Sequence, residues 1–207
     1  MPDRGGEVLA TRVAFLELKD EWRLVQEGYE LLDEKRVLLA TEILRQLRHY
    51  LALQAERLRH EQEARAALLA AVDAYGFDDL TVEPKRSLEN ALVRSSAQTF
   101  LGLRLVEAAL DDAAPAANPE SLQPLPEARA CAKAFRSLLC DHVAIAACVG
   151  NLQRLAREYT RTERRARALE NVVLPEVDLS LRFIEEQLDA VDQEEAVRVR
   201  NAAGARG

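Results

Sequence analysis

The amino-acid sequence predicts an all-α-dominated fold: a long antiparallel coiled coil of two helices, formed by the N- and C-terminal segments, with a small mixed insert at one end. Residues 11–44 contain one glycine and no proline, and their apolar side chains return every three or four positions. Aromatic residues make up only 5% of the chain, while alanine, leucine, arginine and glutamate dominate, a composition typical of long helices. Similar seven-residue repeats occur toward both ends of the chain, which favours pairing of the two end segments.

The first helix is expected over residues 1–75. After Pro2 the next proline is Pro84, and Gly28 is the only glycine between residues 7 and 75, so no strong helix breaker interrupts this segment. Its apolar positions form two series at seven-residue spacing, which are Leu18, Val25, Leu32 and Leu39, and beside them Trp22, Tyr29, Ile43 and Tyr50, with Arg36 interrupting the second series. These series predict a coiled-coil seam, the line along which two helices interlock their apolar side chains.

The second helix is expected over residues 127–207. Pro175 predicts a bend in it, because proline has no N–H and its ring clashes with the carbonyl of Asn171. Apolar residues again repeat at seven, at Leu138, Ile145, Leu152, Tyr159, Ala166 and Val173, and beyond the proline at Leu181 and Leu188 beside Ile184 and Val191. Matching stripes on two helices, with a connection long enough to reverse direction, predict an antiparallel pair.

Residues 76–126 differ in character and are expected to form the insert. Leu101, Leu103 and Leu105 alternate around Gly102, which suits a short strand or a hairpin arm. The segment "VEPKRSLENAL" is a candidate short helix, and "DDAAPAANPESLQPLP" is a candidate proline-rich connector. The insert is therefore expected to be a small head at one end of the paired helices.

Two glycines lie inside the predicted helices, Gly28 and Gly150. Each costs about 1 kcal/mol relative to alanine in a helix interior. Two explanations are open: a tolerated helix glycine, or a point where another backbone or a neighbouring subunit comes close.

Charge and hydropathy argue against several classes of protein. The formal net charge of -7 disfavours nucleic-acid binding, which needs a sustained basic surface. The sequence has no run of eighteen apolar residues and no signal-peptide core, so we expect a soluble cytoplasmic protein without direct membrane insertion. Cys131, Cys140 and Cys148 lack metal-ligand spacing, and we expect small buried or half-buried apolar residues.

Motifs of common enzymes are missing from the sequence. It contains no GxxxxGK[ST], GxGxxG or HExxH pattern, and His60 lies among charged residues typical of a solvated ion-pair face. We therefore expect a non-catalytic protein with no cofactor and no metal. Charge is patterned, however: residues 161–167 carry four arginines, and residues 185–195 carry six acids and no base. Such runs are either solvent-exposed or contact a partner of opposite sign.

Two segments resemble the signatures of a known family. "TRVAFLELKDEWRLVQEGYELLDEKRVLLATEI" resembles the N-terminal signature of the D subunit of V-type and archaeal A-type rotary ATPases, in which a Thr-Arg opening and a Leu-Lys pair lead to the core found here at Gly28, Leu31, Leu32, Lys35 and Arg36. "RTERRARALENVVLPEVDLSLRFIEEQLD" resembles the second signature, with matches at Arg164, Arg165, Ala168, Leu169, Glu170, Val172, Val173 and Pro175. "TFLGLRLVE" is similar to the family's hairpin segment. The two signatures occur in the family's order at the two ends of the chain, which makes the match more specific than either alone.

The resemblance implies a central-stalk rotor subunit that couples ATP hydrolysis or synthesis to rotation of a membrane ring. Its implied partners are the hexameric head of catalytic and regulatory subunits, named A and B, the small F subunit of the stalk, and the C (d) subunit that forms a socket above the ring. The protein would lie in the cytoplasm, peripheral to the membrane through the complex. The signatures, the hairpin segment and the acidic run together give the candidate partner-binding residues: Arg12, Lys19, Gly28, Lys35, Arg36, Leu101, Gly102, Leu103, Arg164, Arg165, Pro175, Glu185 and Glu186.

Two other functions fit a long helical hairpin. One is a rotor-like component of a flagellar or type III export ATPase, which usually has little material at its tip, so the insert at residues 76–126 counts against it. The other is a coiled-coil scaffold with no motor role, which requires both end signatures to be accidental. An enzyme with its catalytic residues in the insert is the remote alternative.

Overall fold

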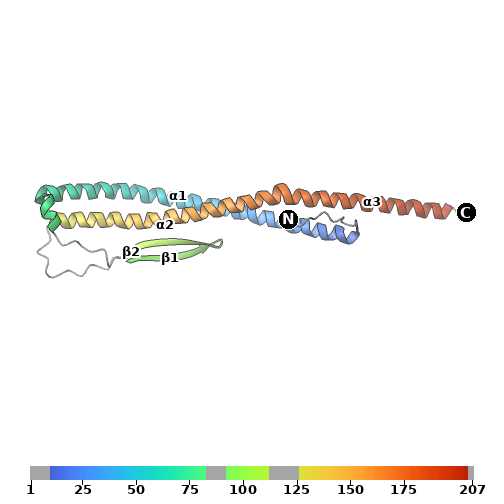
Figure 1. The fold of residues 1–207 in the computed structure, drawn as a ribbon, viewed down its shortest axis with the longest axis horizontal. Coiled ribbons are helices and arrows are strands. Elements are labelled where there is room, and N and C mark those ends of the chain that lie inside the picture. Colours follow the sequence, from blue (N-terminus) through green and yellow to red (C-terminus); the bar gives the residue numbers. More distant parts are fainter. Residues whose placement is uncertain (1–9, 83–91, 112–125, 205–207) are drawn as a thin grey trace. The chain divides into compact units, whose positions relative to one another are not determined.

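The computed structural model describes residues 10–82, 92–111 and 126–204 (Figure 1). The candidate helix "VEPKRSLENAL" and the proline-rich connector fall almost entirely outside these described residues. The chain separates into two compact units, residues 1–38 with 159–207, and residues 39–158. This division by contacts cuts across both long helices, whereas the three-part division into residues 1–75, 76–126 and 127–207 follows the sequence pattern and stays a prediction.

Helix α1 extends over Arg12–Val82. Thr11 caps its start: the Thr11 Oγ1 accepts a hydrogen bond from the Ala14 N–H at 3.1 Å, satisfying one of the free donors of the first turn. The backbone leaves helical geometry at Gly76, with φ 75° and ψ 162°. Positive φ is easily reached only by glycine, so Gly76 allows the kink at the position where the sequence pattern changes.

In the unit formed by residues 39–158, α1 and helix α2 (Pro126–Ala168) lie side by side (Figure 1). Pro126 occupies the first helical position, where its missing N–H is harmless. Contacts between the two helices join Gln46 to Cys148, His60 to Asp141 and Tyr75 to Glu127. Residue numbers fall on α2 as they rise on α1, so the pair is antiparallel, as the sequence predicts.

The hairpin of the same unit consists of β1 (Leu92–Phe100) and β2 (Leu103–Asp111), paired antiparallel with Phe100 opposite Leu103. Leu101 and Gly102 form its two-residue turn, both with positive φ, 49° and 85°. Such φ values belong to the type I′ turn that matches the twist of paired strands. The predicted hairpin is confirmed. Leu101, however, is in the turn and not in the strand, so the expected strand alternation begins at Leu103.

The other unit pairs the start of α1 with the end of α2, a π-helical turn η1 (Leu169–Val173) and helix α3 (Leu174–Gly204). In the π turn the Leu174 N–H donates to the Leu169 carbonyl, five residues back. Pro175 follows directly. A widened turn is a recognised way to accommodate proline in a helix, because it moves the carbonyl away from the ring. The structure thus has a π turn directly before Pro175, while the bend predicted there stays a prediction.

Each unit has a thin core along the helix contact. The largest fully buried side chains are Leu39 and Leu155 in one unit, and Ile184 and Thr162 in the other. Predicted seam residues Leu39, Ala166 and Ile184 are buried, but Trp22 (37% exposed) and Val191 (51% exposed) are not. The other predicted seam residues are half-buried.

One helical stretch in the described residues, Pro126–Ala203, is long and apolar enough to cross a membrane by length and composition, with a mean hydropathy of 1.2 over its best window. Only 11% of that window is buried inside the protein. The cysteines of this stretch differ in exposure: Cys148 is buried and Cys131 half-buried, as expected, whereas Cys140 is exposed. Burial raises the pKa of the Cys148 and Cys131 thiols, which keeps them protonated and chemically quiet.

Candidate functional site

The two end signatures contact each other in the unit that contains both chain ends. Leu169 of the second signature faces Gly28 of the first, where a Cβ built on the glycine would lie 3.8 Å from the Leu169 Cδ1. Farther along, the Arg12 guanidinium donates to both carboxylate oxygens of Asp192 on α3, at 3.1 and 3.2 Å. This ion pair is exposed on both sides, so it orients the ends more than it stabilises them.

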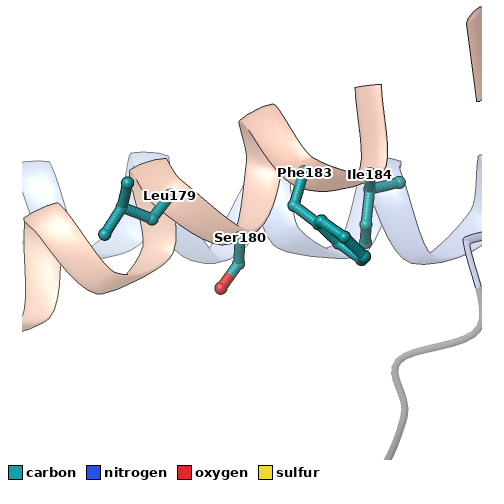
Figure 2. Close-up of a pocket in the computed structure, with 4 residues that line it drawn as sticks. All are labelled: Leu179, Ser180, Phe183 and Ile184. Atoms are coloured by element: carbon teal, nitrogen blue, oxygen red, sulfur yellow. The ribbon is translucent and has the colours of Figure 1, made fainter. Parts of the chain in front are cut away.

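A shallow hollow of about 290 Å³ lies on α3, lined by Leu179, Ser180, Phe183 and Ile184 (Figure 2). Ile184 is buried, while Leu179 is 67% and Phe183 55% exposed. The only polar group here is the Ser180 hydroxyl, which donates to the Glu176 carbonyl at 2.9 Å within its own helix. The hollow is therefore mainly an apolar contact surface.

The hairpin is attached to α2 by one buried amide. Asn151, 3% exposed, donates from Nδ2 to the Val106 carbonyl and accepts at Oδ1 from the Val106 N–H, each at 2.8 Å. Leu105 of β2 is also buried, whereas β1 is exposed over nearly its whole length. Asn151 thus satisfies both backbone groups of one strand residue, as a neighbouring strand would.

A polar cluster on α1 lies near Asn151 along the helix pair, since Gln46 of this cluster contacts Cys148, three residues before Asn151. The Arg45 guanidinium donates to both Glu42 oxygens at 2.7 Å and holds the pKa of Glu42 below its ordinary value of 4.5, against the opposing effect of burial. Gln46 adds a hydrogen bond to Glu42 at 2.9 Å, and Cys148 of α2 lies against Gln46. The bonds among Glu42, Arg45 and Gln46 lie within α1, and the Cys148 thiol links this cluster to α2 by donating to the Gln46 Oε1 at 3.7 Å.

A half-buried histidine, His60, joins the two helices between the Gln46–Cys148 contact and the Tyr75–Glu127 contact. The His60 Nδ1 lies 2.6 Å from the Asp141 Oδ2, with the two side chains 25% and 12% exposed. His60 is therefore a contact between helices and not part of the solvated face that the sequence suggests. Among the residues that the structure describes, no group of three or more His, Cys, Asp or Glu is arranged to hold a metal ion.

Comparison with known proteins decides the family. The family model for the D subunit of ATP synthase matches residues 14–203, nearly the whole chain. The chain belongs to the ATP synthase D-subunit family.

Relatives of this family cover the chain almost end to end. The D subunit of the A-type ATP synthase of Pyrococcus horikoshii is 25% identical over 200 residues, covering 94% of this chain and 92% of its own length. The D subunit of the V-type ATP synthase of Thermotoga neapolitana is 24% identical over 193 residues, 93% and 95% of the two chains. That of Thermus thermophilus is 27% identical over 212 residues, 96% and 88% of the two chains. The resemblance seen in the two signatures thus extends through the insert.

The structure brings some of the candidate partner-binding residues of this D-subunit family member together. Arg12 and Gly28 lie against the returning helix, as described above. Arg36 is half-buried and donates to the Asp33 carboxylate at 2.5 Å, and Lys35 is half-buried beside it. The remaining candidates are not gathered into one site: Lys19, Arg164, Arg165, Pro175, Glu185 and Glu186 are exposed, and Leu101, Gly102 and Leu103 belong to the hairpin of the other unit. Their roles stay predictions.

Counting apolar repeats misses the polar members of the helix contact. Gln46 stands seven residues after Leu39, and Thr162 stands seven after Leu155, so both occupy seam positions. Asn151 lies four residues before Leu155, the other seam spacing. The signal that finds these residues is therefore a polar side chain at a position that the heptad reserves for an apolar one.

Proposed function

We propose that this protein is the central-stalk rotor subunit of an A/V-type rotary ATPase, coupling ATP hydrolysis or synthesis in the head to rotation of the membrane ring. The family match over residues 14–203 carries the proposal. The contact between Gly28 and Leu169 supports it, since it joins the two segments by which the sequence resembles the family. In this role the protein is non-catalytic and nucleotide binds to other subunits.

The proposed partners are the A and B subunits of the hexameric head, the small F subunit of the stalk and the C (d) subunit that forms the socket. The unit with both chain ends is the proposed part inside the head. Its surface is suited to many shallow contacts, because large apolar side chains such as Leu24 (69% exposed), Leu31 (67%) and Leu179 (67%) alternate there with charges. The protein would then be cytoplasmic and peripheral to the membrane through the complex.

Asymmetry provides the mechanism. One rod inside a threefold ring cannot contact three catalytic interfaces equally, so its angle makes their nucleotide affinities different. Because such coupling is reciprocal, binding and hydrolysis in turn favour a new angle of the rod. The seam residues Leu39, Leu155 and Ile184 hold the helices together, which the transmission of torque requires.

Native mass spectrometry tests the proposal. The tagged chain is co-expressed with the head subunits and the small stalk subunit of its own organism, and the masses of the purified assemblies are measured. One copy per six-subunit head, together with one small partner, is the expected result. A coiled coil that associates only with itself and ignores the head contradicts the rotor function and favours the scaffold.

A further inference from the structure

The back of α1 carries a second leucine repeat that the helix pair leaves exposed. Leu44, Leu51 and Leu58 are spaced by seven and are 53%, 58% and 52% exposed, and Leu47, 41% exposed, lies between the first two. The spacing of three and four residues is that of a coiled-coil seam. We call these four residues the outer leucine stripe; all belong to the unit formed by residues 39–158.

The outer leucine stripe lies opposite the seam with α2. Successive residues of a helix are rotated by about 100°, so Leu53, two positions after Leu51, lies about 160° away from it around the axis. Gln46, Leu53 and His60 repeat at seven on that opposite side, where Gln46 is buried and His60 contacts Asp141. α1 therefore has seven-residue repeats on two opposite faces, and α2 contacts the one that contains Gln46 and His60.

Charge beside the outer leucine stripe is basic along one of its two edges. Between residues 40 and 65, no acidic residue lies within about 60° of the line through Leu51, at about 100° per residue. Arg48 lies at one edge, with Arg59 just beyond it, and neither makes an ion pair within the described part of the chain. Arg65, at the other edge, pairs with Glu61 at 2.5 Å. A basic edge on a chain of net charge -7 is a local exception to its composition.

We propose that the outer leucine stripe binds an amphipathic helix of another subunit, with apolar side chains at spacings of three and four and acidic side chains along the edge that faces Arg48 and Arg59. A helix fits because knobs-into-holes packing requires the spacing seen here. Acidic flanks fit because they complement two arginines that make no ion pair within the described part of the chain. The proposal rests on the proposed function only in that the occupant belongs to the same complex.

Site-specific photocross-linking tests the proposal in the full chain. A benzophenone amino acid replaces Leu51, and the protein is irradiated in cells that also express the other subunits of the complex. Cross-linked peptides are then sequenced by mass spectrometry. The expected product joins position 51 to one helical segment of a different subunit with apolar residues at the stated spacing and acids beside them. The same probe at Glu56, exposed on another side of α1, should give at least tenfold less of this product.

A charge reversal tests the acidic flank separately. Arg48→Glu combined with Arg59→Glu should lower the cross-link yield from position 51 about tenfold, whereas Arg129→Glu, an exposed arginine on α2, should leave it unchanged. An equal yield in the double variant overturns the charge part of the proposal. Circular dichroism of each variant checks that the helices are retained.

Other outcomes identify other occupants and overturn the proposal. These are cross-links to lipid, to a second copy of this chain, to another segment of the same chain or to a non-helical segment, and the absence of any product above the Glu56 control. The head subunits that copurify are measured in the same samples. Their presence without the cross-link refutes this inference and leaves the rotor function intact, whereas the cross-link without head subunits refutes the rotor function alone.

Discussion

Asn151 of α2 forms two hydrogen bonds of 2.8 Å with the backbone of a single hairpin residue, Val106. One side-chain amide thereby fixes the position of β2 on the helix. Since backbone groups of a two-stranded hairpin are otherwise exposed at both edges, this contact determines which edge stays free. β1, exposed over nearly all its length, is that free edge.

Asn151→Ala should release the hairpin without unfolding the helix pair. Two bonds are lost, each worth about 0.5–1.5 kcal/mol, so amide exchange at Val106 should accelerate by about tenfold or more. Hydrogen exchange measured by NMR or mass spectrometry checks this, with the exposed neighbour Gln153→Ala as the control. Unchanged protection at Val106 would mean that other contacts, such as the burial of Leu105, hold the hairpin.

Glu42 should make the protein less stable in acid. Its pKa is lowered in the folded state, so its stabilisation is complete above the ordinary value of 4.5 and is lost as the pH falls through the lower folded value. The unfolding free energy of Glu42→Gln should therefore fall less than that of the wild type as the pH drops below 4.5. At pH 7 the variant should be less stable than the wild type by about 1.5–3 kcal/mol. Urea unfolding across this pH range measures both effects, and identical pH profiles would contradict the assignment.

His60 and Asp141 should show a favourable coupling in a double-mutant cycle. Contacting residues of this kind couple by about 0.5–3 kcal/mol. The cycle consists of His60→Ala, Asp141→Ala and the double variant, with the unfolding free energy of each measured at pH 6. His49→Ala, at an exposed position of the same helix, provides the control. If the effects of the two single substitutions on the unfolding free energy simply add, the 2.6 Å contact between His60 and Asp141 contributes no net stability.

Gly28→Ala should separate the two explanations of this glycine. Its added Cβ meets only the Leu169 Cδ1, at an ordinary contact distance of 3.8 Å, so the isolated protein should gain about 1 kcal/mol of stability from helix propensity. If stability rises while assembly with the head weakens, the glycine serves the approach of a neighbouring subunit. If the variant is at least as stable as the wild type and assembles equally well with the head, Gly28 is a tolerated helix glycine.

Pro175→Ala should change coupling more than stability. With alanine the backbone N–H returns, and the π turn at Leu169–Val173 no longer has to accommodate a proline ring. We expect altered coupling of ATP hydrolysis to ion transport in the reconstituted complex, with the thermal unfolding midpoint shifted by only a few degrees. An unchanged coupling ratio would show that the irregular turn is incidental to the motor.

The helices and the hairpin are predictable from the sequence because each follows from a local repeat or turn residue. Leu39 and Ala166 could be assigned to the core by counting sevens, and Gly102 could be assigned to a turn by its permissive backbone. Leu101 could not, since a leucine with positive φ costs about 1–2 kcal/mol and is accepted only because the strands require a two-residue turn.

The polar contacts of the candidate site could not be predicted in the same way. Gln46 and Asn151 are buried beside partners on other elements, Cys148 and Val106, and pairing across 102 and 45 residues has no local signature. His60 likewise stands among charges that suggest solvent, and only the fold places Asp141 beside it. Long-range geometry, rather than composition, determines these positions.

The π turn also explains why the spacing of buried residues in the second helical segment departs from the heptad repeat. Leu155 and Thr162 are buried seven residues apart, and so are Val177 and Ile184, but Thr162 and Val177 are fifteen apart where two full repeats require fourteen. A π turn contains one residue more than an α turn and absorbs this insertion. The heptad repeats before and after Leu169–Val173 are therefore offset by one residue in the sequence, and the extra residue of the π turn compensates for this offset. Deletion of one residue from Leu169–Val173 would give a single uninterrupted heptad repeat.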